Sequence, residues 1–157
     1  MSHLRRPQIW WDNYFLDLAE TAAIPSKDPS TKVGAVIVRP DRTVASLGYN
    51  GFPRGVRDAA ERLDDRDTKY SMVVHAEPNA ILSAHASVSG CTLYSTLFPC
   101  SDCAKLIIQA GIIRVIAPTY SAERDRSLRL RLSRLMFAEA GVRFQLIDRV
   151  TASYATR

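Results

Sequence analysis

Two short segments of the chain carry side chains that are typical of a metal-dependent reaction. His75 and Glu77 form an H-x-E motif, and Pro99, Cys100 and Cys103 belong to a P-C-x-x-C motif. An imidazole and two thiolates are ligands that Zn²⁺ prefers, and three protein ligands leave the fourth position of the ion open, as in catalytic zinc sites. A water in that position has its pKa lowered toward ~7. The two motifs therefore predict a zinc centre that activates water.

Glu77 is the residue that we expect to move protons at this centre. It lies two positions after His75, close enough to reach a metal-bound water without binding the metal itself. A carboxyl group placed there can take a proton from the water and deliver it to a leaving group. H-x-E followed by P-C-x-x-C is the signature of zinc-dependent nucleobase deaminases.

Each motif also has a simpler interpretation. A single His on a helix is usually a packing or surface residue, and an isolated C-x-x-C motif can be redox-active or one half of a structural zinc site. A structural site would need a fourth ligand, and the remaining Cys and His residues, His3, His85 and Cys91, form no second close pair. The two motifs together favour a catalytic site with one zinc ion per subunit.

The composition indicates the class of protein. The chain has 157 residues, of which 46% are hydrophobic and 24% are charged, and this predicts one globular domain spanning residues 1–157. It has no apolar run near the ~18 residues of a membrane span, and its first residues lack the apolar segment of a secretory signal. Three cysteines, two of them in a metal-type motif, argue against a disulfide framework. We therefore expect a cytoplasmic enzyme with no membrane partner.

The chain is basic, with a net charge of +5 and a pI near 9.4. Positive charge favours polyanions or phosphorylated small molecules as partners. However, 17 of the 21 basic residues are Arg spread along the chain, and we see no basic stripe interleaved with aromatic residues, as in proteins that bind single strands. Nucleic acid is therefore not the expected partner.

The rest of the chain is expected to position the two motifs. Hydrophobic periodicity predicts helices over 9–23, 100–110 and 122–140, with a further helix beginning near His75. Pro78 is compatible with that helix only in its first turn, where a missing N–H costs no helical hydrogen bond. Residues 56–70 are charged, and we expect an irregular, solvated excursion over the site. Strands are predicted over 33–38, 43–49, 91–97, 112–117 and 142–147.

This order of elements predicts an α/β fold. After an initial helix and a hairpin, helices and strands alternate to the end of the chain. Such alternation is typical of a three-layer α/β/α sandwich, here with a mixed five-stranded sheet.

Residues 48–55 read G-Y-N-G-F-P-R-G, a composition that suits a shaped loop whose backbone can approach a ligand closely. Asn50 offers both a donor and an acceptor for sugar hydroxyls or a base edge. A tight turn is as consistent with this composition as a binding loop.

Three motifs together resemble the deoxycytidylate (dCMP) deaminase family. They are H-A-E-x-N-A-I at 75–81, L-F-P-C-x-x-C-A-K at 97–105 and G-Y-N-G-x-P-x-G at 48–55, supported by Ser26-Lys27-Asp28-Pro29 and Thr68-Lys69-Tyr70. H-x-E with P-C-x-x-C is shared by the whole cytidine deaminase superfamily, whereas G-Y-N-G and C-A-K narrow the resemblance to its nucleotide branch. The resemblance covers roughly residues 8–148 and implies a cytidine deaminase-like fold.

The resemblance implies hydrolytic conversion of dCMP to dUMP and ammonia, upstream of thymidylate synthesis. It assigns the same three zinc ligands and the same proton shuttle as the residue chemistry does. It also places Asn50 and Ala76 among the substrate-binding residues, and Lys27 and Tyr120 are our candidates for the 5′-phosphate. Pro78 departs from the family pattern, in which an apolar, non-proline residue is more common.

The resemblance also implies a homo-oligomer, commonly a hexamer, with dCTP and dTTP as effectors. The expected effector loop comprises Gly48, Tyr49, Asn50 and Gly51. Two alternatives stay open at this point. The chain could be another deaminase of the superfamily, acting on dCTP, 5-substituted dCMP or tRNA adenosine, or a non-catalytic zinc- and nucleotide-binding regulator. The intact Glu77 argues against the regulator, which would need no proton shuttle.

Overall fold

The computed structural model describes residues 5–149 of the predicted domain. Its centre is a five-stranded sheet in the order β2-β1-β3-β4-β5. β1 is antiparallel to β2 and to β3, whereas β3, β4 and β5 run parallel, so the predicted mixed sheet is confirmed. The strands are β1 (Gly34–Val38), β2 (Val44–Tyr49), β3 (Thr92–Ser95), β4 (Arg114–Pro118) and β5 (Arg143–Ile147).

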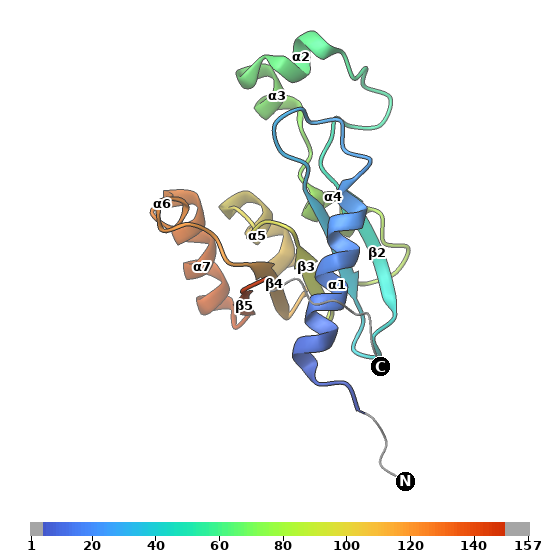
Figure 1. Cartoon of the computed structure of the whole chain (residues 1–157), viewed down its shortest axis with the longest axis vertical. Coiled ribbons are helices and arrows are strands. Elements are labelled where there is room, and N and C mark those ends of the chain that lie inside the picture. The colour runs from blue at the N-terminus through green and yellow to red at the C-terminus, as the bar shows by residue number, and fades with distance from the viewer. Residues whose placement is uncertain (1–4, 150–157) are drawn as a thin grey trace.

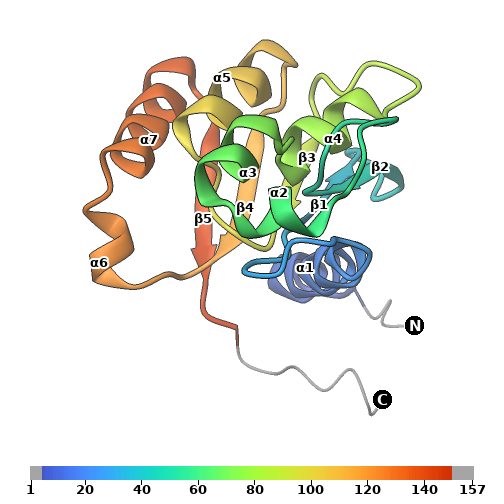
Figure 2. The ribbon, with the colours of Figure 1, turned by 90° about the horizontal axis from the view of Figure 1, so that it is seen from above.

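Helices cover both faces of this sheet, as the three-layer prediction requires (Figure 2). α1 (Gln8–Ala23) lies on one face, and α4 (Ala76–Leu82), α5 (Ser101–Gln109) and α7 (Leu128–Ala140) lie on the other. Figure 1 shows α2 (Ala60–Asp64) and α3 (Arg66–Met72) beyond one end of the sheet. Within residues 5–149, no helix combines the length and apolarity needed to cross a lipid bilayer.

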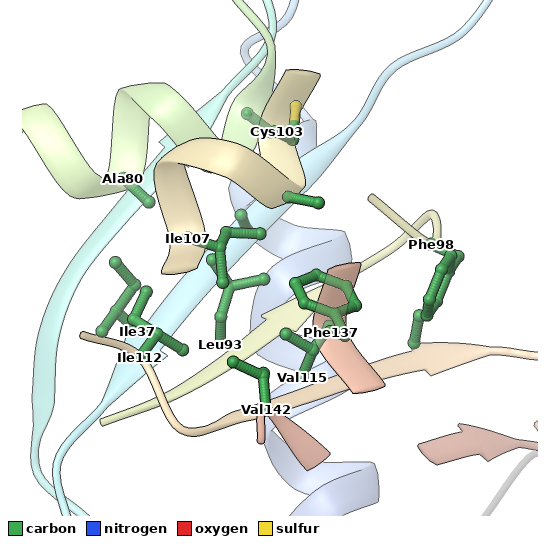
Figure 3. Packing of buried hydrophobic residues seen from close by; sticks show 14 of the residues in the cluster. Ile37, Ala80, Leu93, Phe98, Cys103, Ile107, Ile112, Val115, Phe137 and Val142 are labelled. Atoms are coloured by element: carbon green, nitrogen blue, oxygen red, sulfur yellow. The ribbon is translucent and has the colours of Figure 1, made fainter. Parts of the chain in front are cut away.

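Side chains alternate along the strands between two hydrophobic cores. In β1, Ile37 packs in the core under α4, α5 and α7, whereas its neighbour Val36 packs against α1. Figure 3 shows the first core, in which Ile107 of α5 and Phe137 of α7 meet Leu93 of β3. Burial on both faces explains why β1 and β4 read as nearly continuous apolar runs in the sequence.

The prediction of an irregular excursion over residues 56–70 is wrong, because this segment contains α2 and the start of α3. Asp65 is the N-cap of α3, and its Oδ2 accepts a hydrogen bond from the backbone N–H of Thr68 at 2.9 Å. Both helices are short and mostly exposed, so their charged residues reflect contact with solvent rather than a lack of helix.

The single helix predicted over 122–140 is interrupted. α6 (Ala122–Asp125) ends two residues before Ser127, whose extended backbone begins α7. Arg134 of α7 forms an ion pair with Asp125 and donates a hydrogen bond to the Tyr120 hydroxyl at 3.0 Å. These contacts hold the short α6 against the side of α7, which a continuous helix would not allow.

Candidate active site

The three predicted zinc ligands meet at the beginnings of α4 and α5. His75 is the N-cap residue of α4, and Cys100 is the N-cap residue of α5. Cys103 follows one turn into α5, so its side chain lies on the same side of the helix as Cys100. The ligands come from distant parts of the chain, but α4 and α5 pack on the same face of the sheet and begin next to one another.

The distances between the ligand atoms fit one zinc ion. His75 Nδ1 lies 3.3 Å from Cys103 Sγ and 3.7 Å from Cys100 Sγ, and the two sulfurs are 3.7 Å apart. Tetrahedral bonds of about 2.3 Å to sulfur and about 2.0 Å to nitrogen place such atoms roughly 3.5–3.8 Å apart. In residues 5–149 no second group of three such side chains is close enough to bind a metal, while His3 lies outside the described residues. The geometry therefore supports one zinc ion per subunit.

Cys100 has the properties of a thiolate ligand. Hydrogen bonds from the Cys103 thiol and from His75 lower the pKa of Cys100 to about 3. Cys103 donates this hydrogen bond and is buried, and both effects raise the pKa of Cys103. Arg129 adds a further donor, since its Nη2 lies 3.6 Å from Cys100 Sγ. At neutral pH the site thus already holds one thiolate for a divalent cation.

Glu77 lies beside the metal ligands and is only 3% exposed. Its Oε2 lies 3.5 Å from Cys103 Sγ, and its Oε1 accepts a hydrogen bond from the Ser95 hydroxyl at 3.5 Å. Burial raises the pKa of the Glu77 carboxyl above its ordinary value. A carboxyl group whose pKa is closer to neutrality is suited both to accept and to donate a proton.

A cavity of about 240 Å³ opens onto these groups. Two side chains on its surface, Lys69 of α3 and Arg124 of α6, carry positive charge. Lys69 is only 7% exposed, and its Nζ lies 3.2 Å from both Asp28 Oδ1 and Ser30 Oγ. Burial alone would raise the pKa of Asp28, but the N–H groups of Thr31 and Ser30 and the Lys69 amine outweigh it and lower the pKa. The cavity is therefore lined by the proton-transfer groups, by the Lys69–Asp28 ion pair and by Arg124.

Two of the four predicted substrate-binding residues, Ala76 and Asn50, line this cavity. The Asn50 side chain is already well bonded: its Oδ1 accepts from the Ser26 hydroxyl and the Val33 N–H, both at 2.8 Å. Its Nδ2 donates to the Thr31 carbonyl at 3.0 Å. One N–H of the amide is left to contact a ligand.

The structure does not bring Lys27 and Tyr120 to the cavity surface, which differs from their expected role as phosphate ligands. Lys27 is 67% exposed and forms an ion pair with Asp58. Tyr120 packs against the Phe98 ring and accepts a hydrogen bond from Arg134. Neither side chain is among the groups that a ligand in the cavity would touch.

Lys69 lines the cavity, whereas Lys27 does not, and sequence reasoning did not single Lys69 out as a site residue. The Thr68-Lys69-Tyr70 motif was a signal for it, because these residues belong to the resemblance described above. Because residues 56–70 were interpreted as a solvated segment, Lys69 was not expected to be buried at the cavity. A lysine is rarely this buried unless it is paired, and here Asp28 is the partner.

The predicted effector loop holds α4 against the sheet. A Cβ on Gly48 would lie 2.4 Å from the Ala80 nitrogen and 2.6 Å from the Ala76 oxygen, so β2 approaches α4 backbone to backbone. The Tyr49 carbonyl accepts a hydrogen bond from Asn79 Nδ2 at 2.8 Å, and Gly51 forms a β-bridge with the residue before His75. The loop thereby positions the helix that carries His75 and Glu77.

Comparisons with known proteins agree with this geometry. Residues 9–119 match the family described as "Cytidine and deoxycytidylate deaminase zinc-binding region". The chain is 45% identical over 150 residues to the deoxycytidylate deaminase of Mus musculus, covering 90% of this chain and 82% of that protein. It is 43% identical over 142 residues to a probable deoxycytidylate deaminase of Drosophila melanogaster, covering 78% of this chain and 70% of that protein.

A solved structure shows the same fold. The dCMP deaminase of the cyanophage S-TIM5, in complex with dCMP and dUMP, is 25% identical and superposes with a TM-score of 0.70, covering 91% of this chain and 99% of that chain. This family binds zinc, and His75, Cys100 and Cys103 are the group of side chains in residues 5–149 that could hold the ion. With its ligand geometry and its relatives in agreement, the chain belongs to the cytidine and deoxycytidylate deaminase family.

Proposed function

We propose that this protein is a zinc-dependent dCMP deaminase, which hydrolyses dCMP to dUMP and ammonia. The observation that carries the proposal is the juxtaposition of Glu77 and a three-ligand zinc site at one end of a cavity with Lys69 on its wall. The relatives named as deoxycytidylate deaminases, and the solved enzyme with dCMP and dUMP, support the choice of substrate.

The reaction needs proton transfers that Glu77 is placed to perform. His75, Cys100 and Cys103 would hold the zinc ion, which would supply an activated water and an electrostatic partner for developing negative charge. Glu77 accepts a proton from the water that attacks C4 of cytosine and donates it to N3 of the ring. It then passes the second proton of the water to the amino group, which leaves as ammonia. The burial of Glu77 keeps bulk water from competing for these protons.

The cationic part of the cavity is the proposed phosphate site. Lys69 and Arg124 would bind the 5′-phosphate, in place of Lys27 and Tyr120. A charged donor forms shorter and stronger hydrogen bonds to phosphate than a neutral donor does. The free N–H of Asn50 and the backbone around Ala76 would contact the sugar and the base.

The experiment that tests this function compares substrates with the zinc-loaded protein. We expect kcat/KM for dCMP to exceed that for deoxycytidine by a factor of about 10²–10⁴, because two charge-assisted hydrogen bonds contribute about 1.5–3 kcal/mol each. Equal values for the two would contradict the phosphate site. Preferred turnover of dCTP, 5-methyl-dCMP or a tRNA anticodon stem-loop would instead assign the chain to another deaminase of the superfamily.

We also infer that the subunits associate, as a hexamer. Leu128, Leu132 and Leu135 are exposed on α7, and Leu128 is 61% exposed. Their spacing places them on one side of the helix, where contact with another subunit would remove apolar surface from water. Light scattering coupled to size-exclusion chromatography tests this, and a monomer at micromolar concentration would contradict it.

dCTP as activator and dTTP as inhibitor remain part of the proposal, through the loop of Gly48, Tyr49, Asn50 and Gly51. Initial rates at subsaturating dCMP, with and without each effector, test this part separately. Unchanged rates would leave the loop with the positioning role described above.

We place the reaction in the cytoplasm. The three free cysteines of the protein are compatible with this reducing compartment.

A further inference from the structure

A second, larger concavity lies at the end of the sheet away from the active site, across the ends of several strands. This arginine groove, of about 670 Å³, follows the end at which β3, β4 and β5 begin, whereas the active-site cavity lies beyond the end of β3. None of its lining residues binds the metal or lines the active-site cavity. Four arginines line the groove: Arg39, Arg42, Arg114 and Arg143.

These arginines differ in how far their charge is neutralised. Arg114 donates hydrogen bonds of 2.9 and 2.8 Å to the two carboxylate oxygens of the buried Asp12. Asp41 is the one acidic residue on the groove surface; it lies near Arg39 and also accepts hydrogen bonds from Thr43. Four arginines set against the carboxylates of Asp12 and Asp41 leave a net charge of +2 at the groove.

Arg39, Arg42 and Arg143 have no carboxylate within ion-pair distance among residues 5–149. Arg39 is already bonded to the Thr43 hydroxyl and the Val44 carbonyl, which leaves Arg42 and Arg143 as the more available pair. The Arg42 guanidinium lies 4.7 Å from the centre of the Trp11 ring, which orients it without neutralising it. Arg143 is an exposed residue at the start of β5. Two unneutralised guanidinium groups facing one concavity raise the local concentration of anions.

The beginning of α1 adds positive potential to the groove. Gln8, the first residue of this 16-residue helix, lines the groove. The first turn contains no acidic side chain, and the N-cap residue, Pro7, provides no side-chain hydrogen bond. No acidic side chain of the first turn offsets the partial positive charge of the helix end, and Asp12, which accepts a hydrogen bond from Gln8, is paired with Arg114. Helix and arginines contribute independently to the same charge excess.

We propose that the arginine groove binds a compact anion with two or more phosphate groups, held chiefly by Arg42 and Arg143. Guanidinium groups match phosphate oxygens in a bidentate geometry, and two separate guanidinium groups match two phosphates better than one. The volume lies within the roughly 300–1,000 Å³ of small-molecule sites. Such a ligand would stabilise the end of the sheet that is remote from the reaction.

The aromatic residues of the groove favour a small anion over a nucleic acid strand. Strand-binding surfaces use exposed rings on which successive bases stack. Phe15 and Tyr94, the two aromatic residues that line the groove, are each only 2% exposed. They form its floor and offer no ring face to a base.

Calorimetric titration of the zinc-loaded full chain with inorganic tripolyphosphate tests the proposal. We expect one site per subunit, and at least a tenfold higher Kd in the double variant Arg42→Ala, Arg143→Ala. The control is Arg57→Ala, Arg131→Ala, which removes the same charge from exposed positions outside the groove and should change Kd less than twofold. Turnover of dCMP should be unchanged in the groove variant.

Separate titrations identify the source of the phosphates. Equal affinity for tripolyphosphate and a nucleoside triphosphate supports recognition through phosphates alone, and tighter binding of the nucleotide assigns the ligand to that class. The proposal is overturned by an absence of binding at millimolar tripolyphosphate, or by equal losses in the two double variants. It is also overturned if saturating dUMP displaces the anion, or if a short single-stranded RNA binds more tightly than tripolyphosphate.

Discussion

The Nη2 atom of Arg129 lies 3.6 Å from the Sγ atom of Cys100, so a guanidinium group near the start of α7 donates a hydrogen bond to a zinc ligand. Arg129 is held in place by an ion pair with Asp102, which also accepts a hydrogen bond from Lys105 at 2.7 Å. Donors of this kind orient the ligand and balance its charge. The contact connects a helix that carries no metal ligand to the stability of the metal site.

Replacing Arg129 should therefore accelerate the loss of zinc. We expect Arg129→Leu to release zinc to a chromogenic chelator about tenfold faster than the parent, because partners of metal ligands typically contribute about 10–100-fold in metal affinity. Arg131→Leu removes an exposed charge from the same helix and is the matched control. Equal release rates for all three proteins would show that the hydrogen bond does not affect metal retention.

Glu77→Gln should remove turnover while leaving the zinc site intact. The amide fills the same volume but cannot accept a proton, and we expect kcat to fall by about 10³, within the range of general acid–base catalysis. Zinc content per subunit, measured by atomic emission, should stay at one. Glu61→Gln, at an exposed position of α2, is the control. Near-normal kcat with zinc bound would show that Glu77 is not the proton shuttle.

Lys69 and Lys27 offer a direct comparison of two candidate phosphate ligands. Lys69→Met should raise KM for dCMP at least tenfold, which corresponds to about 1.4 kcal/mol, and leave the slow reaction of deoxycytidine unchanged. Lys27→Met should alter neither, since its amine lies outside the cavity and contacts Asp58. Thermal melting of both variants checks that the fold is kept. A larger increase in KM for Lys27→Met than for Lys69→Met would instead support Lys27 as the phosphate ligand, as the sequence analysis predicted.

Gly48→Ala should disturb both stability and activity. Its Cβ would overlap the backbone of α4, and overpacking of this kind costs about 1–3 kcal/mol. For a chain of this length that corresponds to a decrease in Tm of roughly 3–10 °C, with reduced kcat because α4 carries the metal and proton-transfer residues. Gly51→Ala is the control, because nothing lies within 4 Å of its Cβ position. Equal Tm values for the two variants would contradict the close approach of β2 and α4.

The buried Asp12–Arg114 pair should make stability depend on pH. Burial alone would raise the pKa of Asp12, but hydrogen bonds from Arg114, Gln8 and Tyr94 outweigh it and lower the pKa. A carboxyl group with a depressed pKa in the folded state contributes stability above its unfolded value of about 4 and loses this contribution as the pH falls toward its folded value. Its contribution is therefore fully present at neutral pH.

Asp12→Asn leaves Arg114 without its counter-charge, and we expect it to lower the free energy of unfolding by about 3 kcal/mol at pH 7. The difference between parent and variant should shrink below pH 4, as Asp12 becomes protonated in the parent. Urea unfolding at pH 7, 5 and 3.5 measures this. A difference that is constant over this range would show that the charge of Asp12 makes no contribution.

The zinc ligands and the sheet could be predicted from the sequence because both leave local signals. Only a few side-chain types bind zinc, so the ligands stand out in the sequence. The short motifs that contain them also predict that they lie at the starts of helices. Apolar runs such as residues 33–38 predict strands buried on both faces, since burial on both faces removes the polar alternation. The sheet is confirmed, and the three predicted ligand atoms lie close enough together to hold one zinc ion.

Only the tertiary structure decided which charged side chains face a cavity. Lys27 and Lys69 carry the same charge and both lie in polar segments, yet Lys69 is buried against Asp28, 41 positions earlier in the chain, whereas Lys27 lies in solvent. In the same way, Arg42 and Arg143 line one groove because it runs across the ends of several strands, from the β1–β2 turn past the starts of β3 and β4 to the start of β5. The charge of a side chain is a local property of the sequence, but the neighbours that give it a role are set by long-range packing.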